Sequence, residues 1–294
     1  MKIKEIISLN GELIKTKQTF LLLYTSVFAF FITAVEFPGV YTWDELVFVT
    51  LSLFLAISGT TALNMYLDRD IDAIMERTKN RPLPSGKLKP STVLQNGIFL
   101  VIVGMLIAIL TLNLLTVFII FLGFFFDVVI YTILLKRRTK LSILFGGIAG
   151  GLPALAGRTV IIGVIDVTGL LFLFFILAWI PVHILTIALI PRNFNGYRKA
   201  KIPMWSVVST EKKTMRIIAI GAFFTSIILY ENARHLQVNG IIRIIIGICC
   251  FFLMVLVMRN LMKPSNKLTF LIFKVASLFM IIGFLLLYLG VVFL

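Results

Sequence analysis

Long apolar runs, separated by short polar segments, make up most of this 294-residue chain. A membrane-spanning helix needs about 20 mostly apolar residues. Nine runs approach that length: residues 19–37, 47–66, 94–112, 114–135, 142–165, 168–190, 216–231, 241–258 and 268–293. Runs such as "LLTVFIIFLGFFFDVVIYTILL" are apolar on every side, whereas strands of a membrane β-barrel alternate apolar and polar residues. The pattern predicts an all-α, polytopic membrane protein with about nine transmembrane helices, organised as a single integral-membrane domain over residues 1–294.

Composition also favours a membrane protein, because 60% of the residues are hydrophobic and only 14% are charged, outside the range of soluble domains. When loops are assigned alternately to the two sides, 24 of the 28 Lys and Arg residues fall on one side, which the positive-inside rule identifies as cytoplasmic. The N-terminus, with Lys2, Lys4, Lys15 and Lys17, is then cytoplasmic. The net charge of +15 follows from this bias and from contact with anionic membrane lipids, so it requires no nucleic acid. No cleavable signal segment is apparent, which makes the plasma membrane of a prokaryote the expected location.

The segment "NMYLDRDIDAIMERTKNRPLPSG", residues 64–86, gathers charged residues at the cytoplasmic end of the second run. If the helix continues into this segment, Asn64, Asp68 and Asp72 recur every four residues and share one face. Two carboxylates and an amide oxygen suit Mg²⁺, which is commonly held by a few carboxylates together with substrate phosphates. Arg77 and Arg81 follow, and arginines bind phosphate oxygens in bidentate fashion. A solvated loop that only stops translocation is the alternative, but polar groups at membrane depth are costly and favour a diphosphate and metal site.

The same segment resembles the aspartate-rich NxxxDxxxD motif of the UbiA superfamily of intramembrane prenyltransferases, in the form typical of its haem O synthase (protoheme IX farnesyltransferase) branch. Two later blocks extend the resemblance: "YTILLKRRTKLSILFGGIAGGLPALAG", and "WIPVHILTIAL" followed by "GYRKAKIPM". The three blocks, in this order, span most of residues 45–210. The resemblance implies a UbiA-type bundle of nine helices around a central cavity, capped on the cytoplasmic side by the segments after the second and sixth helices.

The resemblance also implies a reaction. Members of the family ionise an isoprenyl diphosphate with the help of Mg²⁺ and attach the prenyl chain to an acceptor, which in the haem O branch is a vinyl group of protohaem IX. Farnesyl diphosphate or geranylgeranyl diphosphate would be the donor, and water would add to the product. A downstream haem-modifying enzyme or a terminal oxidase assembly would receive it. Carried over to this chain, Asn64, Asp68 and Asp72 would hold Mg²⁺ and act in catalysis.

Other candidate residues follow from the same blocks. Contacts to the departing diphosphate are expected from four basic residues: Arg77, Arg81, Lys136 and Arg137. For Lys136 and Arg137 the alternative is simple positive-inside anchoring. His183 matches the histidine of the third block and would bind haem iron or a propionate, with an interhelical hydrogen bond as the alternative.

The third block also departs from the family pattern. Asn195 and Gly196 stand where the family has two aspartates before Tyr197, which puts a second cation site in question. Asn193, Tyr197 and Lys201 repeat the four-residue spacing of the first motif. Tyr197 and Lys201 are therefore expected at the diphosphate, with the lysine acting where a second Mg²⁺ is missing.

Two ionisable residues, Asp127 and Arg158, lie inside apolar runs and are functional candidates to which the sequence assigns no role. Intramembrane acids also mark ion pathways, so a secondary transporter or channel is the alternative from another class. The acidic cluster lies at one membrane surface and not at the midplane, which favours phosphate chemistry over transport. Within the family, the alternative is a prenyltransferase that acts on a lipid or a quinone precursor.

Overall fold

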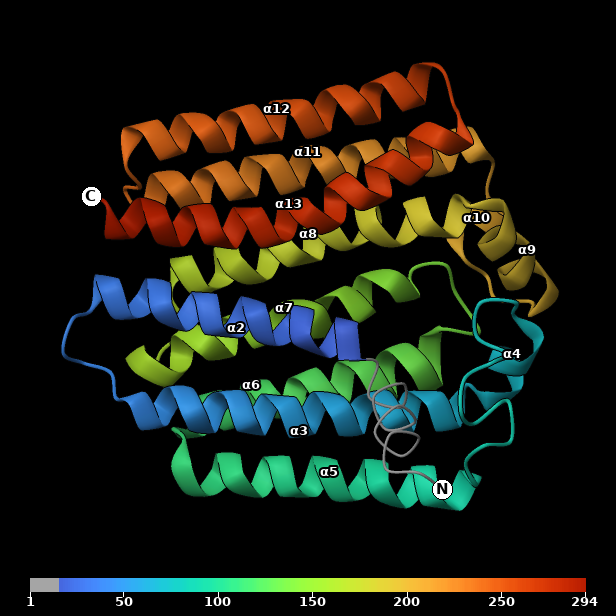
Figure 1. The fold of residues 1–294 in the computed structure, drawn as a ribbon, viewed down its shortest axis with the longest axis horizontal. Helices are drawn as coiled ribbons and strands as arrows, with labels where there is room; N and C mark the ends of the chain where they lie inside the picture. Colours follow the sequence, from blue (N-terminus) through green and yellow to red (C-terminus); the bar gives the residue numbers. More distant parts are fainter. Residues whose placement is uncertain (1–15) are drawn as a thin grey trace.

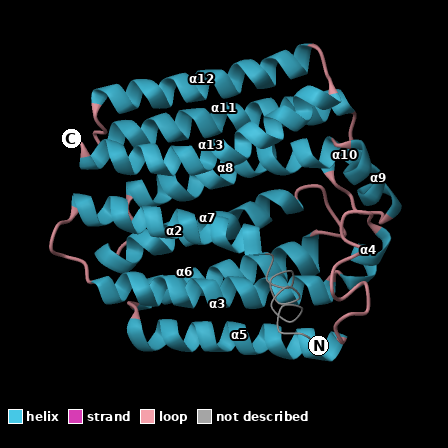
Figure 2. Cartoon of the chain, viewed as in Figure 1, coloured by secondary structure: helices cyan, strands magenta, loops and turns pink. Residues whose placement is uncertain are grey.

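The computed structural model describes residues 16–294, and all regular secondary structure in that range is helical (Figures 1 and 2). Within it, nine helices are long and apolar enough to cross a membrane. They are α2 (Thr16–Glu36), α3 (Trp43–Leu67), α5 (Pro90–Thr111), α6 (Leu114–Phe124) continuing as the π-helix η1 (Phe125–Leu135), α7 (Ser142–Ile162), α8 (Val167–Leu189), α11 (Glu211–His235), α12 (Gly240–Met262) and α13 (Asn266–Val292). These bounds confirm the nine predicted spans to within a few residues. Lys2, Lys4 and Lys15, which belong to the predicted cytoplasmic N-terminus, lie outside the described residues.

Local sequence signals set several helix ends. At the start of α3, the Thr42 hydroxyl accepts a hydrogen bond from the Glu45 backbone N–H (3.3 Å), and the Glu45 carboxylate accepts one from the Thr42 backbone N–H (2.8 Å). This reciprocal pair satisfies two backbone donors that the first turn of a helix leaves open. At the C-terminal end of α7, Gly163 adopts the left-handed conformation with φ +66° and ends the helix. The predicted span 142–165 is too long by three residues because of that glycine.

Close backbone approach joins the first half of the bundle. A Cβ atom placed on Gly59 of α3 would lie 2.6 Å from the carbonyl oxygen of Gly97 on α5, so only glycine fits there. Lipid tails are as apolar as the side chains, so no hydrophobic force drives transmembrane helices together. Small residues let the helices approach closely, and the resulting van der Waals packing stabilises the pair. The larger apolar side chains fall on both surfaces: Phe172 and Phe284 are buried between helices, whereas Phe99 and Phe251 are exposed, as expected for lipid-facing positions.

Three short helices gather at one end of the bundle: α4 (Arg69–Ile74), α9 (Pro191–Lys199) and α10 (Trp205–Val208) (Figure 1). The turn between α12 and α13 lies at the same end, and the C-terminus lies at the opposite end. The loops at the first end are those that carry the basic residues counted above. This end therefore holds the charged motifs, and the central cavity expected from the family stays a prediction.

At the opposite end, a buried arginine joins three helices. Arg158 of α7 donates to both oxygens of Asp166 (2.7 and 2.5 Å) and to Glu36 at the end of α2 (2.5 Å). Asp166 is also the N-cap of α8, where it accepts a hydrogen bond from the Gly169 backbone N–H (2.9 Å). Arg158, which the sequence left without a role, thus ties α2, α7 and the start of α8 together away from the charged motifs.

Candidate functional site

The backbone from Asn64 to Asp72 keeps helical hydrogen bonding through the end of α3. Asp68 departs from helical geometry, with φ −94° and ψ 4°. Nevertheless, the Asp68 N–H donates to the Asn64 carbonyl (2.9 Å) and the Asp72 N–H donates to the Asp68 carbonyl (2.8 Å). The three side chains therefore follow one another along the same edge, and all three are buried.

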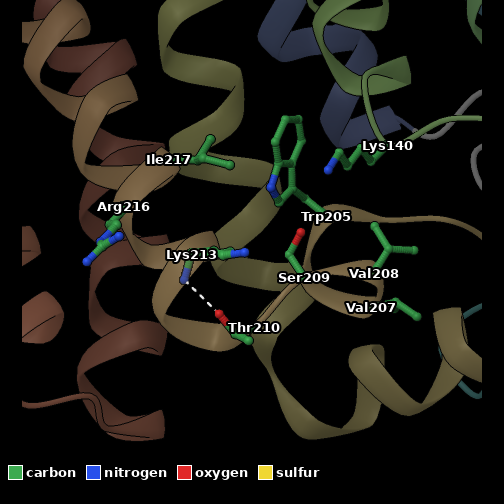
Figure 3. A pocket seen from close by; sticks show the side chains of 9 residues that line it. All are labelled: Lys140, Trp205, Val207, Val208, Ser209, Thr210, Lys213, Arg216 and Ile217. Atoms are coloured by element: carbon green, nitrogen blue, oxygen red, sulfur yellow. Dashed lines mark hydrogen bonds between the residues drawn. The ribbon is translucent and has the colours of Figure 1, made fainter.

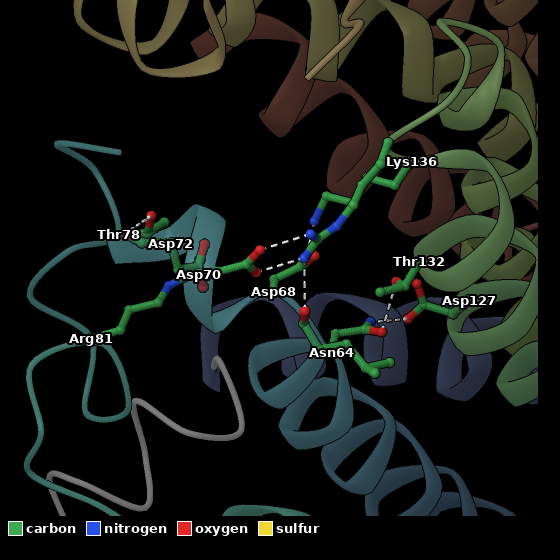
Figure 4. A network of polar contacts seen from close by, with 11 residues as sticks. Asn64, Asp68, Asp70, Asp72, Thr78, Arg81, Asp127, Thr132 and Lys136 are labelled. Atoms are coloured by element: carbon green, nitrogen blue, oxygen red, sulfur yellow. Dashed lines mark hydrogen bonds and ion pairs between the residues drawn. The ribbon is translucent and has the colours of Figure 1, made fainter. Parts of the chain in front are cut away.

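Asn64 is held by two side chains of η1 (Figure 4). Its amide nitrogen donates to Asp127 (3.0 Å), and its amide oxygen accepts a hydrogen bond from the hydroxyl of Thr132 (2.8 Å). Asp127 and Thr132 are five residues apart, a spacing that places side chains on one side of a π-helix, where hydrogen bonds run from i to i+5. The π-helix thus fixes which way the Asn64 amide points.

Asp68 has one paired and one unpaired oxygen. Its Oδ2 atom accepts a hydrogen bond from the ammonium group of Lys136, the first residue after η1. Its Oδ1 atom is buried and has no hydrogen-bond partner among the described residues. An unsatisfied buried carboxylate oxygen costs free energy, about 1–3 kcal/mol or more for a charged group. A ligand for this oxygen would remove that cost.

Asp72 and Asp70 have separate basic partners. Arg81 donates to Asp72 (2.7 Å), and the hydroxyl of Thr78 donates to the Asp72 backbone carbonyl (2.9 Å), which folds the turn after α4 back over the site (Figure 4). Arg137 forms a bidentate pair with Asp70 (2.6 and 2.7 Å). The hydrogen bond from Arg137 holds the pKa of the Asp70 carboxyl below its usual range. Arg81 and Arg137, which the sequence predicts to contact the diphosphate, therefore both lie next to the acidic motif.

The donor set at this edge fits Mg²⁺. Among residues 16–294 no cluster of three or more His, Cys, Asp or Glu side chains is arranged to hold a metal ion. The edge instead offers two carboxylates and an amide oxygen, with a buried Asp68 oxygen that has no hydrogen-bond partner in the described part of the chain. Mg²⁺ usually takes only one or two carboxylates and completes its shell with waters and phosphates, so these residues suffice for it.

The segment around α9 packs on the turn that follows the first motif. Arg192 donates to the backbone carbonyl of Glu76 (2.8 Å), and Gly196 packs on Met75. The glycine that replaces a family aspartate therefore lies at a packing contact. Tyr197 is half-buried in this cap.

Two predicted diphosphate contacts lie outside the polar network. Helix α9 ends at Lys199, and Lys201 follows it in the left-handed conformation with φ 54°, exposed to solvent. The four-residue spacing from Asn193 through Tyr197 to Lys201 therefore does not describe one continuous helix edge. Arg77 is also exposed, in the turn after α4. The roles of Arg77 and Lys201 stay predictions.

His183 lies on α8 and is enclosed by aromatic rings. Its imidazole stacks on Trp179 (4.5 Å between centroids) and contacts Phe273 of α13 (4.9 Å). The Ser277 hydroxyl donates to the Phe273 backbone carbonyl (2.8 Å) and lies 3.2 Å from His183 Nδ1. The donor and acceptor in this contact depend on the imidazole tautomer. In the tautomer with its proton on Nδ1, the serine accepts the hydrogen bond and Nε2 has the lone pair that a metal ion can bind.

A separate hollow opens at the same end, where α10 meets α11 (Figure 3). Trp205 forms one wall, with the Lys140 ammonium 4.7 Å from its ring centroid. Lys213 and Arg216 of α11 line the other side, and Thr210 caps that helix. None of the residues that line this hollow belongs to the network of Asn64, Asp68 and Asp72, so it is a second basic surface.

Sequence reasoning missed the partners that orient the motif. The sequence marks Asp127 only as an ionisable residue in an apolar run and gives no reason to select Thr132. Their separation of five residues carries no signal unless a π-helix is assumed. Both contacts join residues more than 60 positions apart in the chain, so no local pattern could reveal them.

Comparison with known proteins gives a consistent result. Residues 22–279 match the sequence model of the UbiA prenyltransferase family. A protein named protoheme IX farnesyltransferase from Hyperthermus butylicus is 42% identical over 240 residues, covering 80% of this chain and 78% of the relative. One of the same name from Archaeoglobus fulgidus is 37% identical over 271 residues, covering 91% of this chain and 92% of the relative.

Solved structures share the fold at low sequence identity. A structure described as digeranylgeranylglyceryl phosphate synthase superposes with a TM-score of 0.80 at 18% identity, covering 99% of this chain and 100% of the other. A UbiA homologue from Archaeoglobus fulgidus bound to GPP and Mg²⁺ superposes with a TM-score of 0.69 at 13% identity, covering 95% and 99%. At these identities the likeness concerns the fold.

Proposed function

Because this chain belongs to the UbiA prenyltransferase family and is a multi-pass membrane prenyltransferase, we propose that it transfers a farnesyl or longer isoprenyl group to a vinyl group of protohaem IX. The observation that carries the choice of acceptor is the 42% and 37% identity to relatives named protoheme IX farnesyltransferase, over most of both chains. The structure described as digeranylgeranylglyceryl phosphate synthase has a TM-score of 0.80, but at 18% identity it supports only the fold.

In the proposed reaction the bond between C1 of the prenyl group and the diphosphate oxygen breaks, and diphosphate leaves with the bonding electrons. The vinyl π electrons of protohaem form the new carbon–carbon bond to C1. Water adds to the resulting cation and loses a proton, which leaves a hydroxyl group. No step needs a protein nucleophile, so the protein has to stabilise the leaving diphosphate and keep water from the prenyl cation.

Asn64, Asp68 and Asp72 would hold Mg²⁺, which when bound supplies a Lewis acid for the diphosphate oxygens. The unpartnered Oδ1 atom of Asp68 supports this assignment. Lys136 and Arg81 now pair with Asp68 and Asp72. A metal diphosphate brings both a cation and an anion, so the carboxylates can turn to the metal and the basic groups to phosphate without leaving a charge unpaired.

The haem would lie against α8. His183 would offer its Nε2 nitrogen to the iron, with the Ser277 hydroxyl 3.2 Å from the other ring nitrogen. Metal-binding histidines commonly donate their second ring N–H to a fixed acceptor, which sets the orientation of the imidazole. Tyr197, Lys201 and Arg77 would complete the diphosphate site from the cap, and Arg137 would do so from the loop after η1.

We further propose that the site faces the cytoplasm of a prokaryotic cell, with the N-terminus on the same side of the plasma membrane. The support is the basic bias of the loops at the end that carries α4 and α9. A secondary transporter or channel is not favoured, because the chain belongs to a prenyltransferase family.

The test is to express the chain in a host that makes protohaem but no haem O and to measure the mass of the extracted haems. A haem heavier by one prenyl group plus one hydroxyl group is expected, and the added mass also distinguishes farnesyl from geranylgeranyl. The matched control is Asp68→Asn in the same host, inserted in the membrane at the same level, which should leave protohaem unchanged. Unaltered protohaem with the wild-type chain inserted and the donor present would overturn the proposed acceptor.

A further inference from the structure

A group of basic side chains surrounds a hollow at the turn between α12 and α13, away from the network around Asn64. The group consists of Arg259, Lys263, Lys267 and Lys274. All four are exposed, and none forms an ion pair or a side-chain hydrogen bond with another described residue. The sequence contains no Asp or Glu after Glu231, so no acidic neighbour follows in the chain. Among residues 16–294 this basic hollow therefore has no acidic ion-pair partner.

The floor of the basic hollow is apolar and faces outward from the bundle. Leu268, Phe270 and Leu271 of α13 line it, and Phe270 and Leu271 are 44% and 42% exposed. Exposed apolar residues on a transmembrane helix lie against lipid tails. The hollow therefore joins a cationic rim to a wall that hydrocarbon already contacts.

Lys274 is the informative member of the group. It lies eight residues inside α13, about 12 Å along the helix axis at 1.5 Å per residue, and its ammonium group is 4.7 Å from the ring centroid of Phe270. A cation at this depth on a lipid-facing surface is costly unless its long side chain reaches the interface or an anion meets it there. Lys274 lines the hollow together with the other three basic residues.

We propose that this hollow binds an anionic phospholipid, with the headgroup phosphate among the four basic side chains and a hydrocarbon chain along Phe270 and Leu271. Basic pockets between transmembrane helices at the cytoplasmic side attract anionic headgroups. The start of α13, capped by Ser265, adds the positive end of a 27-residue helix at the same place. A phospholipid fits better than a free phosphate because only a lipid uses both the rim and the apolar floor.

Native mass spectrometry of the full chain in detergent tests this proposal. The protein is incubated with phosphatidylglycerol or with phosphatidylcholine of the same acyl chains. The wild-type chain should retain phosphatidylglycerol at concentrations where it does not retain phosphatidylcholine. The double variant Lys267→Gln and Lys274→Gln should bind phosphatidylglycerol more weakly, by about fivefold for each lysine removed, which corresponds to about 1 kcal/mol each.

The matched control is Lys87→Gln with Lys89→Gln, which removes the same charge from exposed residues at the same end of the bundle but outside the hollow. It should retain the lipid as the wild type does. Equal retention of the two lipids, or the same loss in both double variants, would overturn the proposal. Displacement of the lipid by millimolar inorganic phosphate, or by farnesyl diphosphate at its working concentration, would do so as well, because the site would then belong to a free anion or to the prenyl donor.

Discussion

At the scale of single residues, Asp68 differs from the other carboxylates of the first motif in having a buried oxygen without a hydrogen-bond partner among residues 16–294. Asp70, two residues away, shares the same segment but is bound on both oxygens by Arg137 and is largely exposed. Asp68 thus has an oxygen that can bind a metal ion, whereas both oxygens of Asp70 are already bound by Arg137. Their substitution therefore gives a direct comparison.

Asp68→Asn should lower kcat/KM for the prenyl diphosphate by about 10²–10³, the usual cost of removing one preorganised electrostatic group from an active site. The Mg²⁺ concentration for half-maximal activity should rise with it, because a neutral amide attracts the ion less. Steady-state kinetics across a Mg²⁺ titration measures both. Asp70→Asn, the isosteric control, should change either quantity only a few-fold, and an equal loss in both variants would argue against a metal site at Asp68.

His183 supports a second prediction at this scale. His183→Ala should raise the KM for protohaem about tenfold or more, since loss of a metal ligand or of the group that orients it costs on that order. The KM for the prenyl diphosphate should stay unchanged, because His183 is not part of the acidic network. His235→Ala, which alters the other histidine at the exposed end of α11, is the control. A purely structural His183 would shift both KM values or neither.

At the scale of elements, η1 is the feature on which the geometry of the motif depends. It is a π-helix of 11 residues, whereas π-helices are rare and usually last a single turn. In an α-helix, residues five apart differ by about 140° around the axis and could not both reach Asn64. The π-helix brings Asp127 and Thr132 to the same amide, and Lys136 follows at its end beside Asp68.

Asp127→Leu should therefore raise the Mg²⁺ requirement about 10–100-fold, which is the usual effect of losing a group that orients a metal ligand. Asp127→Asn should restore much of the wild-type behaviour, because its amide oxygen can still accept the hydrogen bond from Asn64. Mg²⁺ titrations of both variants, with the circular dichroism spectrum as a check on helix content, provide the measurement. If the leucine variant titrated like the wild type, Asp127 would have no positioning role.

At the scale of the whole molecule, the ion pairs of Arg158 join α2, α7 and α8 at the end opposite the motifs. Arg158→Met should destabilise the fold by about 3 kcal/mol, because two partly buried carboxylates lose their counter-charge. Thermal unfolding in detergent should show a clear fall in Tm. Arg234→Met breaks the exposed pair with Glu231 on the same face and should change Tm little. Similar shifts in the two variants would show that burial of Arg158 adds nothing.

The same cluster predicts a pH dependence. Burial acts to raise the pKa of Asp166, but hydrogen bonds from Arg158 and Gly169 prevail and hold the pKa below its ordinary value of 3.8. The stability from this group is therefore fully present above pH 3.8 and is lost as pH falls through the lowered pKa. Wild-type Tm should fall in that acid range, and Arg158→Met should fall less steeply there because its Asp166 pKa is no longer lowered by the arginine. Parallel curves would contradict this assignment.

The sequence by itself determined the membrane class, the nine spans and the edge formed by Asn64, Asp68 and Asp72. The bilayer fixes the length of each apolar run, and the period of a helix fixes which residues share a face, so both are local properties. Deviations at span ends, such as the stop at Gly163, come from single residues with special backbone angles.

Only the tertiary structure decided what meets that edge. Asn64 contacts Asp127 and Thr132, and Asp68 contacts Lys136, and each contact joins positions more than 60 residues apart. These contacts depend on the π-helix η1, which the apolar sequence of that segment does not predict. The end of α9 before Lys201, the pairing of Arg158 and the unpartnered oxygen of Asp68 also follow from packing. Residue spacing cannot encode them, because each is set by the chain segment that folds against it.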